Sequence, residues 1–332
     1  MADSKLHKFG LSGLLKALFF CAAVVFSGCV KSDKSVRQSL PNHLTVIIDD
    51  PLWNGQVGDS IRKKFASPII GLPQEEPMLS ITQYPLRLME GYMSNDRNIL
   101  VVKNDEKPYF RVEHNQHTNP QNVMYLAGRS VPELLDGLQK HTAQMLDIIR
   151  RTELDVATRQ VDSAQVEREV LKDSFGIAMR IPQAYKQALK ADNLVWFKKD
   201  MVTGNMNVLV YQVPMHCLER GTNIIGNITR MRDSVGALYI HGREAESRMI
   251  TEKAFAPYLS RQTISGLKAY ETRGIWELTN DYMSGPFINL SMVDKDKNRI
   301  LVLEGFCYAP SQEKRELMLE LEAILRTIAF EP

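Results

Sequence analysis

The chain has 332 residues, of which 44% are hydrophobic and 24% are charged. This composition is typical of a globular protein, and it excludes intrinsically disordered, collagen-like and polytopic membrane proteins. Without the first 29 residues, which hold three lysines and one aspartate, the 41 basic and 39 acidic residues become 38 and 38. A body without net charge has no electrostatic attraction to phosphates, so we expect no nucleic-acid partner.

Residues 1–29 have the order of a secretory signal peptide. Lys5, His7 and Lys8 form a basic region, and Ala17 to Gly28 is a run of 12 residues without a charge. A helix needs about 20 residues to cross the hydrocarbon core of a bilayer, so this run is too short to span a membrane. It fits the apolar region of a signal peptide.

The tetrapeptide Phe26-Ser27-Gly28-Cys29 resembles a bacterial lipobox, although Phe26 stands where Leu, Val or Ile is usual. The resemblance implies that Cys29 is acylated and becomes the first residue of the mature protein. Two alternatives are an uncleaved N-terminal anchor helix and ordinary signal cleavage near Gly28. Lipoproteins of this kind carry two or three acyl chains, which anchor stably, whereas one chain binds a bilayer only marginally.

Residues 30–42 are predicted to form a flexible tether between the anchor and the body. Its first residues, Val30-Lys31-Ser32-Asp33-Lys34, are net basic. Surface-exported lipoproteins of the kind that the lipobox resembles carry acidic residues at this place. We therefore expect a body that is lipid-anchored to the outer membrane and faces the periplasm.

The N-terminal half, residues 43–172, shows strand and helix patterns in alternation. Apolar, β-rich runs predict four strands, and apolar residues spaced about four apart predict a helix from Trp53 to Phe65. Ser130 is a plausible N-cap for the helix that follows it. The helical pattern is long, because neither Gly nor Pro interrupts positions 138–173. This pattern predicts one spine between the halves, or two helices with a bend. The predicted strands are 44–48, 97–103, 109–113 and 123–126, and residues 68–77, with three prolines, are irregular.

The C-terminal half, residues 173–332, begins with an alternating run at 175–182 that predicts a half-buried strand. A short helix is predicted at 185–189 and a further helix at 223–239, and Ser311 is the expected N-cap of a terminal helix. Residues 294–298 form the turn of a predicted hairpin. The remaining predicted strands are 194–198, 207–213, the run around Trp276, 288–293 and 299–308.

Together these elements predict an α+β fold with two halves, each a mainly antiparallel sheet packed by helices, and a long central helix. Several segments resemble an uncharacterised domain-of-unknown-function family of Bacteroidetes lipoproteins. The resemblance covers essentially the whole mature chain, and it implies location and class but no activity. The segments that carry it are Leu44–Ile48, Asp49-Asp50-Pro51-Leu52-Trp53, Gly58-Asp59-Ser60-Ile61, Leu72-Pro73-Gln74-Glu75-Glu76-Pro77 and Arg97-Asn98-Ile99-Leu100.

Two cysteines remain in the body after the signal peptide and Cys29 are set aside. In an extracytoplasmic compartment Cys217 and Cys307 can form a disulfide, which would close a loop of about 90 residues. The alternative is two free thiols, and free cysteines are among the most buried residue types. Cys307 lies in the apolar run 301–308, so we favour free thiols.

Three groups of residues have metal-binding or catalytic potential, and each also has a structural interpretation. His114 and His117 lie in a polar segment with Asn119-Pro120, which indicates a loop rather than a zinc site. The run from Asp294 begins like a calcium loop but has Arg299 where glycine is required, so a charged turn is the better interpretation. Glu75-Glu76 lies between prolines and is expected in an exposed, constrained loop. We expect neither a metal nor another cofactor.

Three Asp-Ser-apolar tripeptides resemble the short acceptor for O-glycosylation in Bacteroidetes. They make Ser60, Ser163 and Ser234 candidate glycan acceptors. Three residues form a permissive pattern, so this hypothesis depends on the lipoprotein interpretation of the N-terminus.

No Gly-x-Ser-x-Gly, Walker, His-Glu-x-x-His or Gly-x-Gly-x-x-Gly pattern occurs in the sequence, so no catalytic residue is assigned. The favoured hypothesis is a membrane-anchored extracytoplasmic lipoprotein that binds or scaffolds an envelope protein or a glycan and is not an enzyme. The alternative hypothesis is an extracytoplasmic hydrolase or carbohydrate-active enzyme with an unrecognised site. A pocket of convergent polar groups with perturbed pKa values would favour the enzyme, and an apolar patch would favour the binding protein.

Overall fold

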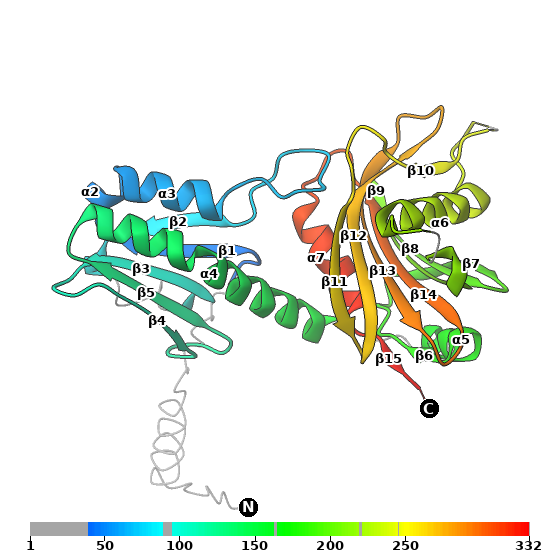
Figure 1. The fold of residues 1–332 in the computed structure, drawn as a ribbon, viewed down its shortest axis with the longest axis horizontal. Helices are drawn as coiled ribbons and strands as arrows, with labels where there is room; N and C mark the ends of the chain where they lie inside the picture. Colours follow the sequence, from blue (N-terminus) through cyan, green and yellow to red (C-terminus); the bar gives the residue numbers. More distant parts are fainter. Residues whose placement is uncertain (1–38, 89–94, 163–164, 219–220, 245, 332) are drawn as a thin grey trace, which may run out of the picture. The chain divides into compact units, whose positions relative to one another are not determined.

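The computed structural model describes residues 39–88, 95–162, 165–218, 221–244 and 246–331, and Figure 1 shows two large sheets in this part of the chain. Within these ranges five strands form the first sheet, eight form the second, and two short strands form a small third sheet. Residues 39–332 belong to a single unit. The predicted signal peptide and the lipobox Cys29 lie outside the described residues.

The N-terminal sheet has the strand order β2-β1-β3-β5-β4. β1 pairs in parallel with β2 and β3, and β3 pairs in parallel with β5, whereas β4 runs antiparallel to β5. The strands are β1 (His43–Ile48), β2 (Ser80–Tyr84), β3 (Asn98–Asn104), β4 (Tyr109–His114) and β5 (Asn122–Gly128), and a 3₁₀ turn, η1 (Leu86–Leu88), follows β2.

The α+β class is confirmed, but the prediction of a mainly antiparallel sheet is wrong for this half. Parallel neighbours need a crossover connection. Helices α2 (Asp50–Trp53) and α3 (Gln56–Phe65) supply it between β1 and β2. The strands β3 and β5 are buried along most of their length, as parallel strands are when both faces of the sheet are covered.

The predicted long helix is confirmed as α4 (Val131–Gln160), which contains 30 residues. Ser130 precedes it with extended backbone but makes no capping bond through its side chain. Instead, the Glu133 carboxylate accepts a hydrogen bond from the backbone N–H of Arg129 at 2.9 Å. A separate helix, α5 (Gln165–Phe175), follows, so the helical pattern contains two helices.

Helices α3 and α4 cover one face of the N-terminal sheet. Their buried side chains recur four or seven positions apart and pack on alternate residues of β1, β3 and β5. This core contains Leu44, Val46, Ile48, Val57, Ile61, Phe65, Leu100, Val102, Met124, Leu126, Leu134, Leu138, Met145 and Ile149.

The C-terminal sheet is antiparallel at each described pairing, as predicted, and has the order β10-β12-β13-β14-β9-β8-β7 with β11 beside β12. Its strands are β7 (Lys186–Ala191), β8 (Leu194–Met201), β9 (Gly204–Pro214), β10 (Met249–Thr251), β11 (Tyr258–Ile264), β12 (Leu267–Leu278), β13 (Ser284–Asp294) and β14 (Arg299–Tyr308).

Two of the elements predicted for this half differ in the structure. The short helix expected at 185–189 is the strand β7, which pairs with β8. A segment this short is a marginal helix, and pairing at the sheet edge satisfies its backbone instead. The strand expected at 175–182 is reduced to β6 (Ile177–Ala178), which pairs with β15 (Ala329–Phe330).

Helices cover both faces of the C-terminal sheet. Helix α6 (Ile224–Tyr239) packs on one face of the sheet and follows the 3₁₀ turn η3 (Met215–Cys217) in the sequence. The side chain of its N-cap, Asn223, accepts a hydrogen bond from the backbone N–H of Gly226. Helix α7 (Arg315–Leu325) packs on the other face and also contacts α4 (Figure 1). None of the helices in the described ranges has the length and hydropathy that are needed to cross a bilayer.

Helix α7 begins at Arg315, with Lys314 as its N-cap, so the prediction that Ser311 caps this helix is wrong. The cap comes instead from Glu76, whose carboxylate accepts hydrogen bonds from the backbone N–H groups of Lys314 and Arg315, each at 2.8 Å. A carboxylate is favourable at this end of a helix because of the helix dipole. Residue 76 thereby ties the loop 67–79 to the C-terminal helix.

Candidate functional site

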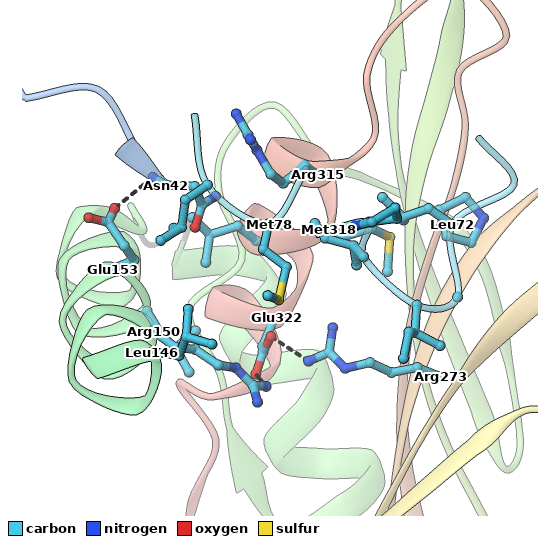
Figure 2. A pocket seen from close by; sticks show the side chains of 18 of the residues that line it. Asn42, Leu72, Met78, Leu146, Arg150, Glu153, Arg273, Arg315, Met318 and Glu322 are labelled. Atoms are coloured by element: carbon cyan, nitrogen blue, oxygen red, sulfur yellow. Dashed lines mark hydrogen bonds and ion pairs between the residues drawn. The ribbon is translucent and has the colours of Figure 1, made fainter. Parts of the chain in front are cut away.

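A cavity of about 480 Å³ lies where α4, α7, the loop 67–79 and the strands β12 and β13 meet. Figure 2 shows side chains from α4 on one side, Arg273 of β12 on the other, and Met78, Met318 and Glu322 between them. The volume falls in the range of about 300–1,000 Å³ that is usual for small-molecule sites. The position between separate elements is also typical of such sites.

Most of the cavity wall is apolar. Helix α4 contributes aliphatic side chains spaced three to five positions apart, and the loop and α7 contribute both methionines that Figure 2 labels. Methionine is flexible and fits irregular ligands well. The apolar lining residues are Pro68, Ile69, Ile70, Leu72, Met78, Leu79, Leu146, Ile149, Leu154, Pro286, Phe287, Met318 and Leu319.

Glu322 lies between two arginines at this cavity (Figure 2). One oxygen of its carboxylate accepts from Nη2 of Arg273 at 2.5 Å, and the other accepts from Nη2 of Arg150 at 3.2 Å. Burial alone would raise the pKa of the Glu322 carboxyl, but the charges of Arg273 and Arg150 outweigh it and lower the pKa to about 2. The carboxylate is therefore ionised throughout the neutral range.

The ion pairs continue behind Glu322. Glu271 accepts from Nε of Arg273 at 2.7 Å and from Nη2 of Arg326 at 2.6 Å, and Arg326 also reaches Glu322 at 3.3 Å. Burial lowers the pKa of Arg273, but the facing charges of Glu322 and Glu271 outweigh it and raise the pKa. We call Arg150, Glu271, Arg273, Glu322 and Arg326 the arginine–glutamate cluster.

A second buried carboxylate, Glu153, lines the α4 side of the cavity. It accepts from Nη1 of Arg97 at 2.6 Å, from the side-chain amide of Asn98 at 2.7 Å and from the backbone N–H of Asn42 at 3.2 Å. The carboxylate of Glu153 is thus hydrogen-bonded to residues at the start of strands β1 and β3, and these bonds hold α4 against the N-terminal sheet.

The loop 67–79 forms a further wall and is held at both ends. Pro68 and Pro77 form an isolated bridge, and the backbone N–H of Ile69 donates to the carbonyl of Glu76 at 2.8 Å. Gly71 has φ of +90°, a left-handed conformation that favours glycine. The irregular segment is confirmed, but Glu76 is buried against α7, so the expectation of an exposed Glu75-Glu76 pair is wrong for Glu76.

The predicted modification sites that the structure describes do not line this cavity. Ser60 is half-buried on α3, and Ser234 is exposed on α6, where its hydroxyl donates to the carbonyl of Arg230. Cys217 is half-buried and Cys307 is buried, and both are free thiols. Burial raises the pKa of the Cys307 thiol to about 12. Ser163 and Cys29 lie outside the described residues.

The polar groups that were considered for metals have structural partners. His114 lies in β4, and its Nδ1 is 3.0 Å from the side-chain oxygen of Asn122. Asp294 accepts from Nε of Arg299 at 2.8 Å across the β13–β14 hairpin, which is confirmed. Within the residues that the structure describes, no group of three metal-ligating side chains is present.

The sequence prediction missed this cavity because its lining comes from six segments that are separated in the sequence: residue 42, the loop 67–79, α4, β12, β13 and α7. One local signal was available on α4: Leu146, Arg150, Glu153 and Leu154 have helical spacing and share one face with buried apolar residues. A carboxylate on the apolar face of a helix is buried and needs a polar partner. Glu153 therefore predicts a contact between α4 and a polar group of another element.

Two family comparisons together cover the body of the chain. Residues 38–162 match the family described as domain of unknown function DUF8532, and residues 163–327 match domain of unknown function DUF4837. No curated protein matches the sequence.

Solved structures match at low similarity. The Saccharomyces cerevisiae Ran-binding protein Mog1p has 7% identity and a TM-score of 0.30, with 47% of this chain and 90% of that chain covered. Human StAR-related lipid transfer protein 5 has 9% identity and a TM-score of 0.24, with 53% and 98% covered. At these scores neither a fold nor a function is transferred.

Proposed function

From the cavity of this chain, whose body matches two domains of unknown function, we propose that it is a lipid-anchored extracytoplasmic binding protein for a small, largely apolar ligand. The anchor is the acylated Cys29, and the body faces the periplasm from the outer membrane. The order of basic region, uncharged run, small residues and cysteine in residues 1–29 supports the anchor.

The observation that carries the binding role is the apolar cavity of about 480 Å³ beside α4 and α7. Removing an apolar ligand surface from water yields about 25 cal/mol per Å², so an apolar wall of this kind binds apolar molecules without further chemistry. The flexible Met78 and Met318 fit the wall to the ligand, and the loop 67–79, held by Glu76, encloses it.

The state of the charged groups favours binding over hydrolysis. A general acid needs a pKa near the working pH. The pKa of Glu322 is lowered to about 2 instead, and Glu153 is engaged by Arg97 and Asn98. These carboxylates therefore hold the elements around the cavity together.

The test is binding of the uncharged fluorophore N-phenyl-1-naphthylamine to the full chain in detergent-free buffer. Leu146→Trp fills the cavity from α4, and we expect it to reduce the affinity at least tenfold. Leu238→Trp, at an exposed position on α6, is the matched control and keeps the wild-type affinity. Thermal unfolding shows that both variants fold. Equal binding by wild type and by folded Leu146→Trp contradicts the proposal.

A further inference from the structure

The arginine–glutamate cluster carries three guanidinium groups and two carboxylates. Arg150, Arg273 and Arg326 face Glu271 and Glu322, and each of the two carboxylates lies within 4 Å of all three guanidinium groups. Counted by formal charge, three guanidinium groups against two carboxylates leave one positive charge in excess beside a mostly apolar cavity.

The other charges at the cavity wall are matched one to one. Glu153 pairs with Arg97 at 2.6 Å. Arg315 pairs with Glu316 at 2.8 Å, and its remaining nitrogens donate to the carbonyl of Pro77 and the hydroxyl of Ser80. The excess positive charge therefore belongs to the cluster.

Arg150 is the member of the cluster that is best able to bind a further anion. Its side chain is 59% exposed, whereas the side chains of Arg273 and Arg326 are 26% and 18% exposed. Its contacts to Glu322 and Glu271, at 3.2 and 3.7 Å, are longer than those of Arg273, at 2.5 and 2.7 Å. If Arg150 turns to a ligand, Glu322 keeps both Arg273 and Arg326 as partners.

We propose that the ligand of this cavity is a long-chain carboxylate, with its head group on the guanidinium of Arg150 and its alkyl chain along Leu146, Leu154, Met78 and Met318. This inference rests on the proposed function and names the ligand class. A carboxylate carries one negative charge at neutral pH, which balances the excess charge, whereas a phosphate monoester carries about −1.5 to −2. Arginine also binds carboxylates through two parallel hydrogen bonds.

The test is displacement of N-phenyl-1-naphthylamine from the full chain at neutral pH by three amphiphiles with the same alkyl chain. Dodecanoate is anionic, dodecan-1-ol is neutral and dodecyltrimethylammonium is cationic. We expect dodecanoate to bind about tenfold more tightly than dodecan-1-ol, because a charge-assisted hydrogen bond contributes about that factor. Acetate, which has the head group alone, is expected not to displace the fluorophore.

Two neighbouring arginines give a matched pair of variants. Arg150→Gln is expected to abolish the preference for dodecanoate over dodecan-1-ol, and Arg150→Lys to retain part of it. Arg151→Gln removes the same charge one residue away, where Arg151 pairs with Asp147 on α4 and does not line the cavity, and it is expected to keep the full preference.

The outcomes separate this inference from the proposed function. Equal affinity of wild type for dodecanoate and dodecan-1-ol overturns the carboxylate assignment, while loss of fluorophore binding in Leu146→Trp would still support the cavity. Equal loss of the preference in Arg150→Gln and Arg151→Gln overturns the role of Arg150. Displacement by acetate alone overturns the requirement for the alkyl chain.

Discussion

At the scale of single residues, Glu322 lines the cavity and also contributes to the folding stability of the protein. Its side chain is 6% exposed and contacts Arg150, Arg273 and Arg326. Removing one partner from a buried ionic network leaves the opposite charges uncompensated, which costs about 3–5 kcal/mol. We therefore expect Glu322→Gln to lower the free energy of unfolding in urea by about that amount at neutral pH.

The same residue predicts how stability depends on pH. The pKa of Glu322 is lowered from its ordinary value of 4.5, which applies to the unfolded chain, to about 2 in the folded protein. Its contribution to the free energy of unfolding is therefore fully present above pH 4.5 and is lost as the pH falls towards 2. Urea unfolding should show a steeper loss between pH 4.5 and 2 for wild type than for Glu322→Gln. Glu313→Gln, at an exposed position just before α7, should keep the wild-type slope. Parallel pH profiles of wild type and Glu322→Gln would contradict this.

At the scale of secondary-structure elements, the loop 67–79 and α7 act together. Glu76 caps α7 across a separation of 238 residues in the sequence, while its loop forms a wall of the cavity. Loss of a helix cap costs about 1–2 kcal/mol. Glu76→Ala should lower the free energy of unfolding by this amount and weaken binding of N-phenyl-1-naphthylamine, because the wall loses its attachment. Glu75→Ala, an exposed neighbour, should change neither, and equal effects of the two variants would refute the capping role.

The sequence predicted the elements whose signal is local. The strands 97–103 and 123–126 are short apolar runs, and the long pattern after Ser130 is α4. It did not predict that β1, β3 and β5 are parallel, because strand direction depends on crossovers and not on composition. Residues 186–191 form an edge strand through pairing with β8, which is also a long-range effect.

Local sequence patterns could not predict the candidate site, because its residues also come together only through long-range contacts. Arg150, Arg273 and Glu322 come from α4, β12 and α7, and their spacing along the chain encodes no motif. The cap of α7 was misplaced at Ser311 because the capping carboxylate belongs to residue 76. The signal that the sequence does contain is a buried carboxylate on an apolar helix face, as at Glu153, because such a group needs a polar partner from another element.

At the scale of the whole molecule, the proposed lipid anchor at Cys29 ties the body of the protein to a membrane. Acylation of Cys29 with two or three chains gives stable attachment. We expect Cys29→Ala to release the protein from the membrane fraction after a salt wash and to remove the acyl mass from the intact chain. Cys21→Ala, within the signal region, is the control that keeps the anchor. Membrane retention and acylation of Cys29→Ala would contradict the lipoprotein assignment.

The cavity itself is tested most directly by the methyl resonances of its two methionines in the full chain, labelled with ¹³C at the methionine methyls. Saturating N-phenyl-1-naphthylamine should shift the resonances of Met78 and Met318, which line the cavity. It should leave those of Met231 and Met249, which pack on the α6 side of the sheet, unchanged. Shifts confined to Met231 and Met249, or no shift at saturation, would contradict a ligand site between α4 and α7.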